Sequence, residues 1–246
     1  MRTSTKIWIA TLALLAFSMV IYDLGLRAEY RSGKYKIPFN DYTDLHFKDF
    51  DTINVRSVSA ANVFFEQGPF RVRLAPGAEE FTRINQDKRT LNIEAVFKHS
   101  YQNNQSAYTV IISCPKIAEL KTSAWYGTNG TSFTDTVVHD EWNMRKVWVQ
   151  GFKQDSLVIR QDYGSRVFLS NNNIAVLNAA IGLSNGSGSQ LNILNTNHFG
   201  NVTLNIGNKS TLLMDNIPIS GFNCRLADSA KIVLTGAAKD ILKSNK

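Results

Sequence analysis

The hydrophobic positions of this chain fall into two different patterns, one long run and many short ones. Residues 7–22 form an uncharged apolar run, and residues 24–26 extend it to about 20 residues, interrupted by Asp23. A helix of that length rises about 30 Å, which is enough to cross the hydrocarbon core of a bilayer. We therefore predict a transmembrane anchor at residues 7–26, after a short cytoplasmic segment at residues 1–6.

The alternative for this segment is a cleaved signal peptide. Residues 16–18 (Ala-Phe-Ser) have the small residues of a cleavage site, but bulky residues 19–22 continue the apolar run beyond it. Arg2 and Lys6 favour a cytoplasmic N-terminus, although further basic residues lie between positions 27 and 36 on the other side. Under both alternatives the body is exported, so we expect it to lie outside the cytoplasm.

Beyond the anchor the apolar runs become short. Residues 27–49 are polar and aromatic, and we interpret them as a linker or stalk. From Phe50 onward, runs of three to five β-type residues alternate with turn residues, and none has helical periodicity over ten residues or more. Many short strands separated by turn signals are typical of an all-β fold.

The C-terminal third repeats. Apolar triplets recur there with steps near ten residues or multiples of ten, several of them after a small polar cluster. The triplets are 157–159, 167–169, 191–193, 202–204, 211–213 and 231–234. Repetition at a short fixed period indicates a stacked architecture in which no unit buries its own apolar face.

Composition supports stacking. Asparagine provides 13 of the 53 residues from 171 to 223, whereas charged residues are rare from 171 to 234. In stacked coils like residues lie about 4.8 Å apart, so like charges repel, while Asn tolerates the left-handed backbone of corners and forms amide ladders. We predict an all-β body, a right-handed parallel β-helix or β-solenoid, at residues 50–236, followed by a basic tail at 237–246. A β-sandwich would alternate more cleanly and carry more charge.

The net charge of +7, from 27 Lys and Arg against 20 Asp and Glu, does not change this interpretation. Residues 1–26 contribute +1 and residues 239–246 contribute +2, which leaves about +4 for the body. A body of that size and charge is not the basic surface that nucleic acids require, so nucleic acid is not an expected partner. The hydrophobic content of 43% with 19% charged residues excludes a disordered chain.

Several strand motifs are similar to those of a known family. They are FDTINV at 50–55, NVFFEQG at 62–68, LNI at 91–93, YTVIISCPKIAEL at 108–120 and DSAKI at 228–232. With these motifs the chain resembles, over about residues 50–236, the head GIN domain family, the auto-transporter adhesin head domain of exported Bacteroidetes proteins. Thr122-Ser123-Ala124 stands where that family usually has a Ser-Gly pair. The resemblance implies a β-solenoid and an exported location, so we expect a single-pass protein of the bacterial envelope with its body in the periplasm or on the cell surface. It carries over no catalytic residue.

The sequence offers few groups with the spacing that catalysis or metal binding requires. His139, Asp140 and Glu141, with Asp135 nearby, lack His-x-x-x-His or Cys-x-x-Cys spacing, and we interpret them as a solvated loop. Nucleophile-elbow, phosphate-loop and Rossmann motifs are absent from the sequence, so we expect no cofactor and no enzyme. Cys114 and Cys224 are expected to be buried free thiols rather than a disulfide.

Aromatic residues are the strongest candidates for binding. The candidate set lies in or beside an insert at residues 122–146 and consists of Trp125, Tyr126, Phe133, Trp142 and Trp148. Exposed aromatic rings suit sugar rings or partner surfaces, and the alternative is that they cap the apolar end of the stack.

Two functions follow from these observations. The first is a non-enzymatic, membrane-anchored envelope protein whose solenoid binds a polysaccharide or another envelope protein. The alternative is a polysaccharide-acting β-helix enzyme, a lyase or hydrolase, which requires carboxylates such as Asp162, Asp215 and Asp228 to align on one face.

Overall fold

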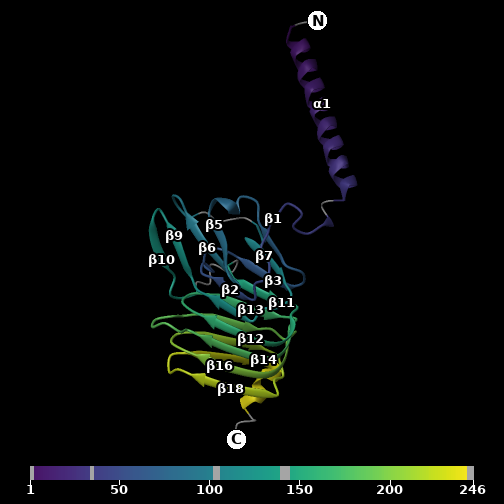
Figure 1. Cartoon of the computed structure of the whole chain (residues 1–246). Coiled ribbons are helices and arrows are strands. Elements are labelled where there is room, and N and C mark those ends of the chain that lie inside the picture. The colour runs from purple at the N-terminus through teal and green to yellow at the C-terminus, as the bar shows by residue number, and fades with distance from the viewer. Residues whose placement is uncertain (1–2, 34–35, 102–105, 139–144, 243–246) are drawn as a thin grey trace. The chain divides into compact units, whose positions relative to one another are not determined.

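The computed structural model describes residues 3–33, 36–101, 106–138 and 145–242. The chain divides into two compact units, Met1–Tyr42 and Thr43–Lys246. Most of the second unit is β-structure, and the first contains a single long helix (Figure 1). A mostly β fold with an N-terminal apolar helix, as predicted, is therefore confirmed.

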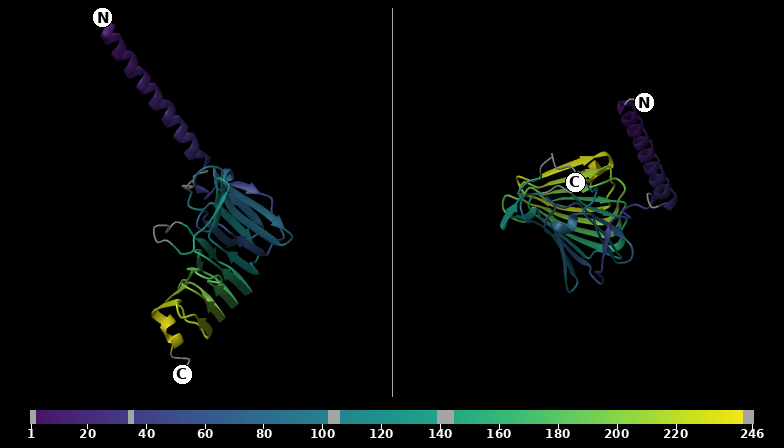
Figure 2. Two further views of the ribbon diagram at one scale, coloured as in Figure 1. Left: turned by 90° about the vertical axis from the view of Figure 1, so that its left-hand side faces the viewer. Right: turned by 90° about the horizontal axis from the view of Figure 1, so that it is seen from above.

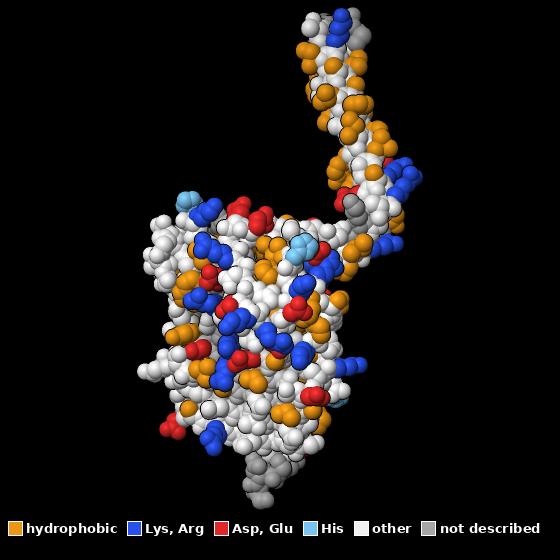
Figure 3. Space-filling model, viewed as in Figure 1, with side chains coloured by type: hydrophobic (Ala, Val, Ile, Leu, Met, Phe, Trp, Pro, Cys, Tyr) orange, Lys and Arg blue, Asp and Glu red, His pale blue; other side chains and the backbone are white. Residues whose placement is uncertain are grey.

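Helix α1 (Thr3–Ser32) extends the predicted anchor at both ends. Its C-terminal extension follows from helix-forming residues and from an ion pair between Asp23 and Arg27, one turn apart, with Nε and Oδ2 separated by 2.9 Å. No residue of the helix is buried, and Figure 3 shows apolar side chains along its length. In length and composition it is suited to crossing a membrane.

The body consists of two sheets. In spatial order the nine-stranded sheet contains β1 (Thr43–Leu45), β4 (Arg71–Leu74), β7 (Val110–Cys114), β3 (Val63–Gln67), β11 (Val147–Gln150), β13 (Arg166–Ser170), β15 (Gln190–Ile193), β17 (Thr211–Asp215) and β19 (Lys231–Thr235). The ten-stranded sheet contains β10 (Thr131–Thr134), β9 (Trp125–Thr128), β6 (Thr90–Phe97), β2 (Thr52–Val55), β8 (Glu119–Thr122), β12 (Lys153–Gln161), β14 (Asn173–Ile181), β16 (His198–Ile206) and β18 (Gly221–Leu226). Strand β5 (Thr82–Asp87) pairs with β6. The body also contains the 3₁₀ helices η2 (Ala78–Glu80) and η4 (Gly236–Leu242).

From β11 onward, successive strands alternate between the two sheets, and from β13 onward each pairs in parallel with the strand two positions earlier (Figure 2). Val147 lies beside Val167, and Leu191 lies beside Leu212, so one complete turn of the chain takes about 20 residues. Because each turn contributes a strand to both sheets, the apolar triplets recur at half that interval. This explains the step near ten residues in the sequence.

Inward-facing side chains stack into continuous apolar rows. On the nine-stranded sheet one row contains Val63, Val147, Val167, Leu191 and Leu212, each essentially inaccessible to solvent. In strands such as β3, β11 and β17 alternate residues point inward, so the two sheets bury their rows against each other. This burial stabilises coils that individually have no core.

The N-terminal half of the body is less regular than the predicted parallel coil. Strands β1, β4, β5 and β10 pair in antiparallel fashion. The β5–β6 and β9–β10 connections contain two residues each, Lys88-Arg89 and Asn129-Gly130, whereas a parallel crossover requires about a dozen. Asn129 and Gly130 both have positive φ (48° and 74°), as in the favoured two-residue hairpin turn.

The order of the coils also differs from the order of the sequence. Strand β2 lies between β6 and β8, and β3 lies between β7 and β11. The first coil of the chain is therefore inserted between two coils that follow it in the sequence.

The segments predicted as stalk and tail both contribute to the body. Strand β1, within the predicted 27–49 linker, pairs with β4, and Asp44 forms an ion pair with Arg71 across them. Helix η4, within the predicted 237–246 tail, buries Ala238 and Ile241. Three residues apart on a 3₁₀ helix, these two side chains lie on one face, which explains how a short basic segment covers apolar surface.

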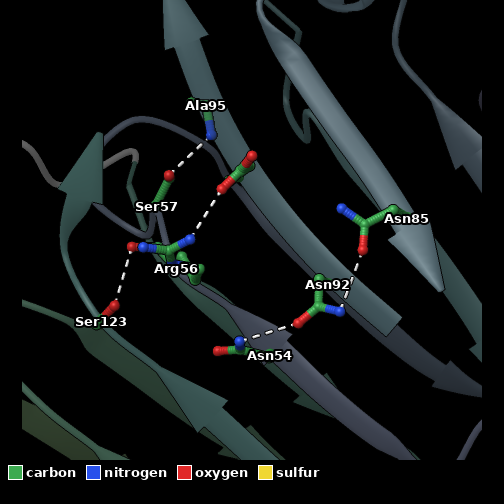
Figure 4. A network of polar contacts seen from close by, with 8 residues as sticks. Asn54, Arg56, Ser57, Asn85, Asn92, Ala95 and Ser123 are labelled. Atoms are coloured by element: carbon green, nitrogen blue, oxygen red, sulfur yellow. Dashed lines mark hydrogen bonds and ion pairs between the residues drawn. The ribbon is translucent and has the colours of Figure 1, made fainter. Parts of the chain in front are cut away.

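Asparagine has the two roles expected from the sequence. Asn171, Asn208 and Asn216 occupy left-handed corners. Side-chain amides also join strands: Asn54 donates to Asn92 (Nδ2 to Oδ1, 3.0 Å), which donates to Asn85 (3.2 Å), across β2, β6 and β5 (Figure 4). Figure 3 shows few charged side chains over β14, β16 and β18, where such uncharged residues predominate.

Candidate interaction surfaces

The structure divides the predicted aromatic set between the two sheets. Trp125 and Tyr126 lie on β9 and Phe133 on β10, at the edge of the ten-stranded sheet. Trp148 lies on β11 in the nine-stranded sheet. Trp142 is outside the described residues. Trp148 is therefore not part of one surface with the other three.

The rings at the β9–β10 edge mostly contact one another. Tyr126 and Phe133 are directly opposite in the hairpin, with ring centroids 5.6 Å apart. Phe97, only 2% exposed, is within 6.4 Å of Tyr126 and stacks on Phe81 at 4.8 Å. The Arg56 guanidinium lies 4.5 Å from the centre of the Trp125 ring. Phe133 is the most open of these residues, with 42% of its surface exposed.

A second group of rings lies on the outer face of the nine-stranded sheet. Phe64, Trp148 and Phe168 occupy one register position on β3, β11 and β13, and we call them the aromatic stripe. Each is half-buried, and each follows an inward-facing valine. The Trp148 and Phe168 rings are nearly parallel, with centroids 5.0 Å apart and an interplanar angle of 8°. The parallel pairing of the strands thus places aromatic side chains from three segments side by side.

Polar groups fix the orientation of the stripe. The indole Nε1 of Trp148 donates to the Ser170 hydroxyl at 2.7 Å and to Gln150 Oε1 at 3.0 Å. The Lys146 ammonium lies 5.1 Å from the Trp148 ring centre and 5.3 Å from that of Phe168. Burial, together with the nearby Arg166 charge, lowers the pKa of Lys146. A cation held over two rings gains a cation–π attraction and limits ring motion.

Sequence reasoning found Trp148 but missed Phe64 and Phe168. The signal was present, because the three residues occupy the middle of similar triplets: Val63-Phe64-Phe65, Val147-Trp148-Val149 and Val167-Phe168-Leu169. An aromatic residue between two inward-facing apolar residues must point outward. Aligning the triplets by register, rather than searching one insert, would have identified the stripe.

The three aspartates considered for catalysis do not converge. Asp162 follows β12, and Asp228 follows β18, three coils further along the same edge. At about 4.8 Å per coil their separation is about 14 Å, larger than the span of paired catalytic carboxylates. Asp215 ends β17 in the other sheet and accepts a hydrogen bond from Thr235 at 2.7 Å.

Asp162 instead has a structural role as a hydrogen-bond acceptor. Burial alone would raise the pKa of Asp162, but hydrogen bonds from the Ser184 hydroxyl and from the backbone N–H groups of Ser184 and Tyr163 outweigh it and lower that pKa. The carboxylate therefore ties the corner after β12 to the next coil. Within the described part of the chain no three His, Cys, Asp or Glu residues are grouped closely enough to hold a metal ion. His139, Asp140 and Glu141 lie outside those residues.

The two cysteines are both free, as predicted. Cys114 in β7 is buried, and burial raises the pKa of its thiol to about 12. Cys224 in β18 is only partly buried, less than expected, because β18 is the last strand of its sheet. A protonated, buried thiol is a poor nucleophile, so Cys114 has the character of a core residue.

No family model matches the chain, and no curated protein matches it. One similar solved structure is described as a "putative adhesin" from Bacteroides fragilis, with TM-score 0.45, 10% identity, and coverage of 79% of this chain and 96% of that chain. A "putative lipid binding protein" from Parabacteroides distasonis has TM-score 0.38, 12% identity and coverage of 79% and 94%. A "putative adhesin" from Parabacteroides merdae has TM-score 0.31, 11% identity and coverage of 79% and 93%.

Proposed function

We propose that this chain is a non-enzymatic, membrane-anchored protein of the bacterial envelope whose body presents a surface for adhesion or interaction. The observation that carries the proposal is the aromatic stripe of Phe64, Trp148 and Phe168 on the outer face of the nine-stranded sheet. Outward-facing aromatic rings provide large contact area with a polar rim, the composition of sites that bind sugars or protein partners.

The stripe is held rigidly, which favours binding. Its members lie on strands with parallel neighbours on both sides, and Trp148 is fixed by Ser170, Gln150 and Lys146. A partner that covers a preorganised surface loses little side-chain entropy on binding. The ligand classes that suit such a surface are a polysaccharide and another envelope protein.

The proposal includes the finer features of fold and location. The alternation of parallel strands between two sheets from β11 to β19 supports a right-handed parallel β-helix, or solenoid, for that part of the body. The motifs at residues 50–55, 62–68 and 108–120 support membership of the head GIN domain family. Helix α1 supports a single-pass anchor with the body in the periplasm or on the cell surface.

A polysaccharide-acting enzyme is the weaker alternative. It requires two carboxylates, or a carboxylate and a base, on one face of the coil. Asp162, Asp215 and Asp228 are distributed over two edges of the body, and Asp162 is engaged by Ser184 and Tyr163. Nucleic acid is also not proposed as a partner, because the body carries only a small net charge.

The test is retention of envelope material by the full chain in lipid nanodiscs, with empty nanodiscs as background. Peptidoglycan and solubilised envelope proteins are the two probes. We expect binding to at least one, weakened about tenfold or more by the double change Trp148→Ala and Phe168→Ala, because central aromatic residues contribute about 2 kcal/mol or more. Leu213→Ala, on the same face two coils further along, is the matched control. Absence of binding, or binding unaffected by the double change, would refute the proposal.

A further inference from the structure

A groove lies on the ten-stranded sheet where β12, β14 and β16 begin, and its volume is 540 Å³. It is separate from the aromatic stripe, which belongs to the other sheet. Three successive coils contribute to it through residues 153–155, 173–175 and 198–200. The groove therefore crosses the strands rather than following one of them. We call it the corner groove.

Two rows of exposed residues form its sides. Lys153, Asn173 and His198 are register partners and make the first row. The second row contains Asp155, Ala175 and Gly200. Between the rows, Ile174 and Phe199 point inward and are almost completely buried (0% and 7% exposed). The first row is thus rich in donors and acceptors, whereas the second has small residues on two of its three coils.

Gly200 has no side chain, so no group of the second row projects from the sheet at that coil. A Cβ atom at this position would lie 2.7 Å from the carbonyl oxygen of Ala175, closer than side-chain carbon atoms approach a backbone oxygen. Any larger residue would have to displace the neighbouring coil. Close packing of the coils therefore requires a glycine at position 200, which leaves the second row open there.

Buried asparagines fix the first row in place. Asn172 and Asn197, which immediately precede Asn173 and His198, are joined by a hydrogen bond of 2.9 Å from Nδ2 to Oδ1. Both are buried (0% and 1% exposed), and the Asn172 Oδ1 also accepts from the backbone N–H of Phe152, the residue before Lys153. Each side chain of the first row is thus attached to a rigid corner. The spacing between its members is set by the coil repeat of about 4.8 Å.

The end of the groove formed by β12 is also rigid. The side-chain amide of Gln154 pairs with the backbone of Ile117, accepting from its N–H at 3.1 Å and donating to its carbonyl at 2.7 Å. Because β8 begins only at Glu119, this amide replaces the missing backbone partner. All three coils therefore present a preformed surface, and a ligand would not have to order it.

We propose that the corner groove binds an extended, uncharged glycan chain lying along the stack, with one sugar unit facing each coil. Sugar units of an extended β-1,4-linked chain advance by a distance close to the coil repeat, so one unit faces each coil. Successive units are turned by about half a turn, so hydroxyl groups from alternate edges of the chain meet Lys153, Asn173 and His198. The C–H faces of the rings lie over Ala175 and Gly200. Asp155 offsets the Lys153 charge on the first coil, which suits an uncharged ligand.

Other polymers fit the groove less well. An extended peptide advances about 3.3 Å per residue and places like side chains about 6.7 Å apart, out of phase with a 4.8 Å repeat. Its usual mode of binding to a sheet also requires an unpaired edge, whereas β12, β14 and β16 all have partners on both sides. A nucleic acid requires a series of basic side chains, and this groove includes an acidic one.

This inference names a ligand and a site for the interaction that the proposed function leaves general, and in that sense rests on it. The probes are cellohexaose and chitohexaose, neutral β-1,4-linked hexasaccharides of glucose and N-acetylglucosamine, titrated calorimetrically into the full chain in nanodiscs. We expect at least one to bind, and the corresponding disaccharide to bind at least tenfold more weakly because it reaches fewer coils.

The decisive variant is Ala175→Trp. It places a large side chain in the second row of the groove, at an exposed strand position. We expect it to weaken hexasaccharide binding at least tenfold, while Ala180→Trp, on the outer face of the same strand, leaves binding unchanged. Asn173→Ala should weaken binding severalfold by removing hydrogen-bonding groups from the first row. Circular dichroism melting of each variant establishes that the body is folded.

The outcomes separate this inference from the proposed function. If neither hexasaccharide binds, or if a folded Ala175→Trp variant binds as the unchanged chain does, the corner groove is not a glycan site. Envelope material retained through the aromatic stripe would then still support the proposed function. If the Ala175→Trp variant loses hexasaccharide binding and the Trp148→Ala, Phe168→Ala double variant keeps it, the corner groove is the glycan site. That result supports this inference without testing the aromatic stripe.

Discussion

Asn172 is a polar residue in the interior of the body, and each side-chain atom that can form hydrogen bonds is used. Its Oδ1 accepts from the Phe152 N–H at 3.0 Å, and its Nδ2 donates to the Val149 carbonyl at 3.0 Å and to Asn197 Oδ1 at 2.9 Å. An amide carries donors and an acceptor on one small planar group, which an aliphatic or hydroxyl side chain cannot match. This explains why an asparagine occupies the corner.

Replacement of Asn172 should therefore be costly. Asn172→Ala leaves the Phe152 N–H and the Val149 carbonyl without their buried partner, and we expect the free energy of unfolding to fall by about 3 kcal/mol. Denaturant unfolding measures this change. Asn178→Ala, at an exposed position of β14, the strand that directly follows Asn172, should change the free energy of unfolding by less than about 0.5 kcal/mol. Equal effects of the two substitutions would contradict the role of the corner amide.

Asp162 should contribute to acid sensitivity. Its pKa in the folded protein lies below that of an unfolded aspartate, so its ionised form stabilises the fold above about pH 4. That contribution is lost as pH falls through the lower folded pKa. We expect Asp162→Asn to flatten the decline in unfolding free energy below pH 4, measured by denaturant unfolding at several pH values. A curve parallel to that of the exposed Asp155→Asn variant would contradict this assignment.

Among the elements, the turn between β14 and β15 illustrates how tightly the coils are packed. Gly182 and Gly186 both have positive φ (71° and 79°), but their surroundings differ. A Cβ atom at Gly182 would collide with the Gly207 carbonyl and the Ser210 hydroxyl, whereas at Gly186 it would meet no atom within 4 Å. The two glycines thus separate the cost of a left-handed backbone from the cost of close approach.

This difference gives a paired prediction. Gly186→Ala should lower the free energy of unfolding by about 1–2 kcal/mol, the cost of the left-handed conformation alone. Gly182→Ala should lower it by at least about 3 kcal/mol, because a neighbouring coil must also move. Denaturant midpoints of the two variants measure the difference. If Gly186→Ala proves the more damaging, the coils are not in the close contact described.

The sequence predicts elements well where one residue pattern determines them. Alternate apolar positions in the triplets from 157 onward indicate strands, and their step near ten residues indicates stacking, because register is set by the apolar face. The pairing in the N-terminal half was not predicted. It depends on which distant strand covers β2 and β3, and residues 52–55 and 63–67 carry no local signal for that choice. Asn129-Gly130 carries a local hairpin signal, but it was not used for a prediction.

The candidate surfaces were predicted less completely than the strands. Trp148 was identified because it lies beside the insert at residues 122–146, but its neighbours Phe64 and Phe168 are adjacent only through parallel pairing. The corner groove was not predicted at all. Lys153, Asn173 and His198 are unremarkable in the sequence, and they become a row only when the coil repeat of 20 to 25 residues is known.

For the whole molecule, the simplest prediction concerns helix α1. Its apolar side chains are exposed in the unit to which it belongs, which suits a lipid environment. We expect the full chain expressed in a Gram-negative host to stay in the membrane fraction after carbonate washing. A variant that lacks residues 1–36 should be soluble and melt at the same Tm, because the body has its own core.

The intact mass of the membrane-bound protein tests the anchor itself. A mass that includes residues 7–26 supports an uncleaved anchor, whereas loss of that segment identifies a signal peptide. Release of the full chain by carbonate would show that α1 does not span the bilayer.

The position of β2 and β3 between later coils has a consequence for biosynthesis. We expect coils from β13 onward to be added one after another as the chain is made, because each pairs with the one before it. The first coil must wait with uncovered flanks until β6, β7 and β8, and finally β11, have been made. Closing that long-range arrangement sets a slow first step, and the exposed strands of the nascent chain would be substrates for chaperones during that interval.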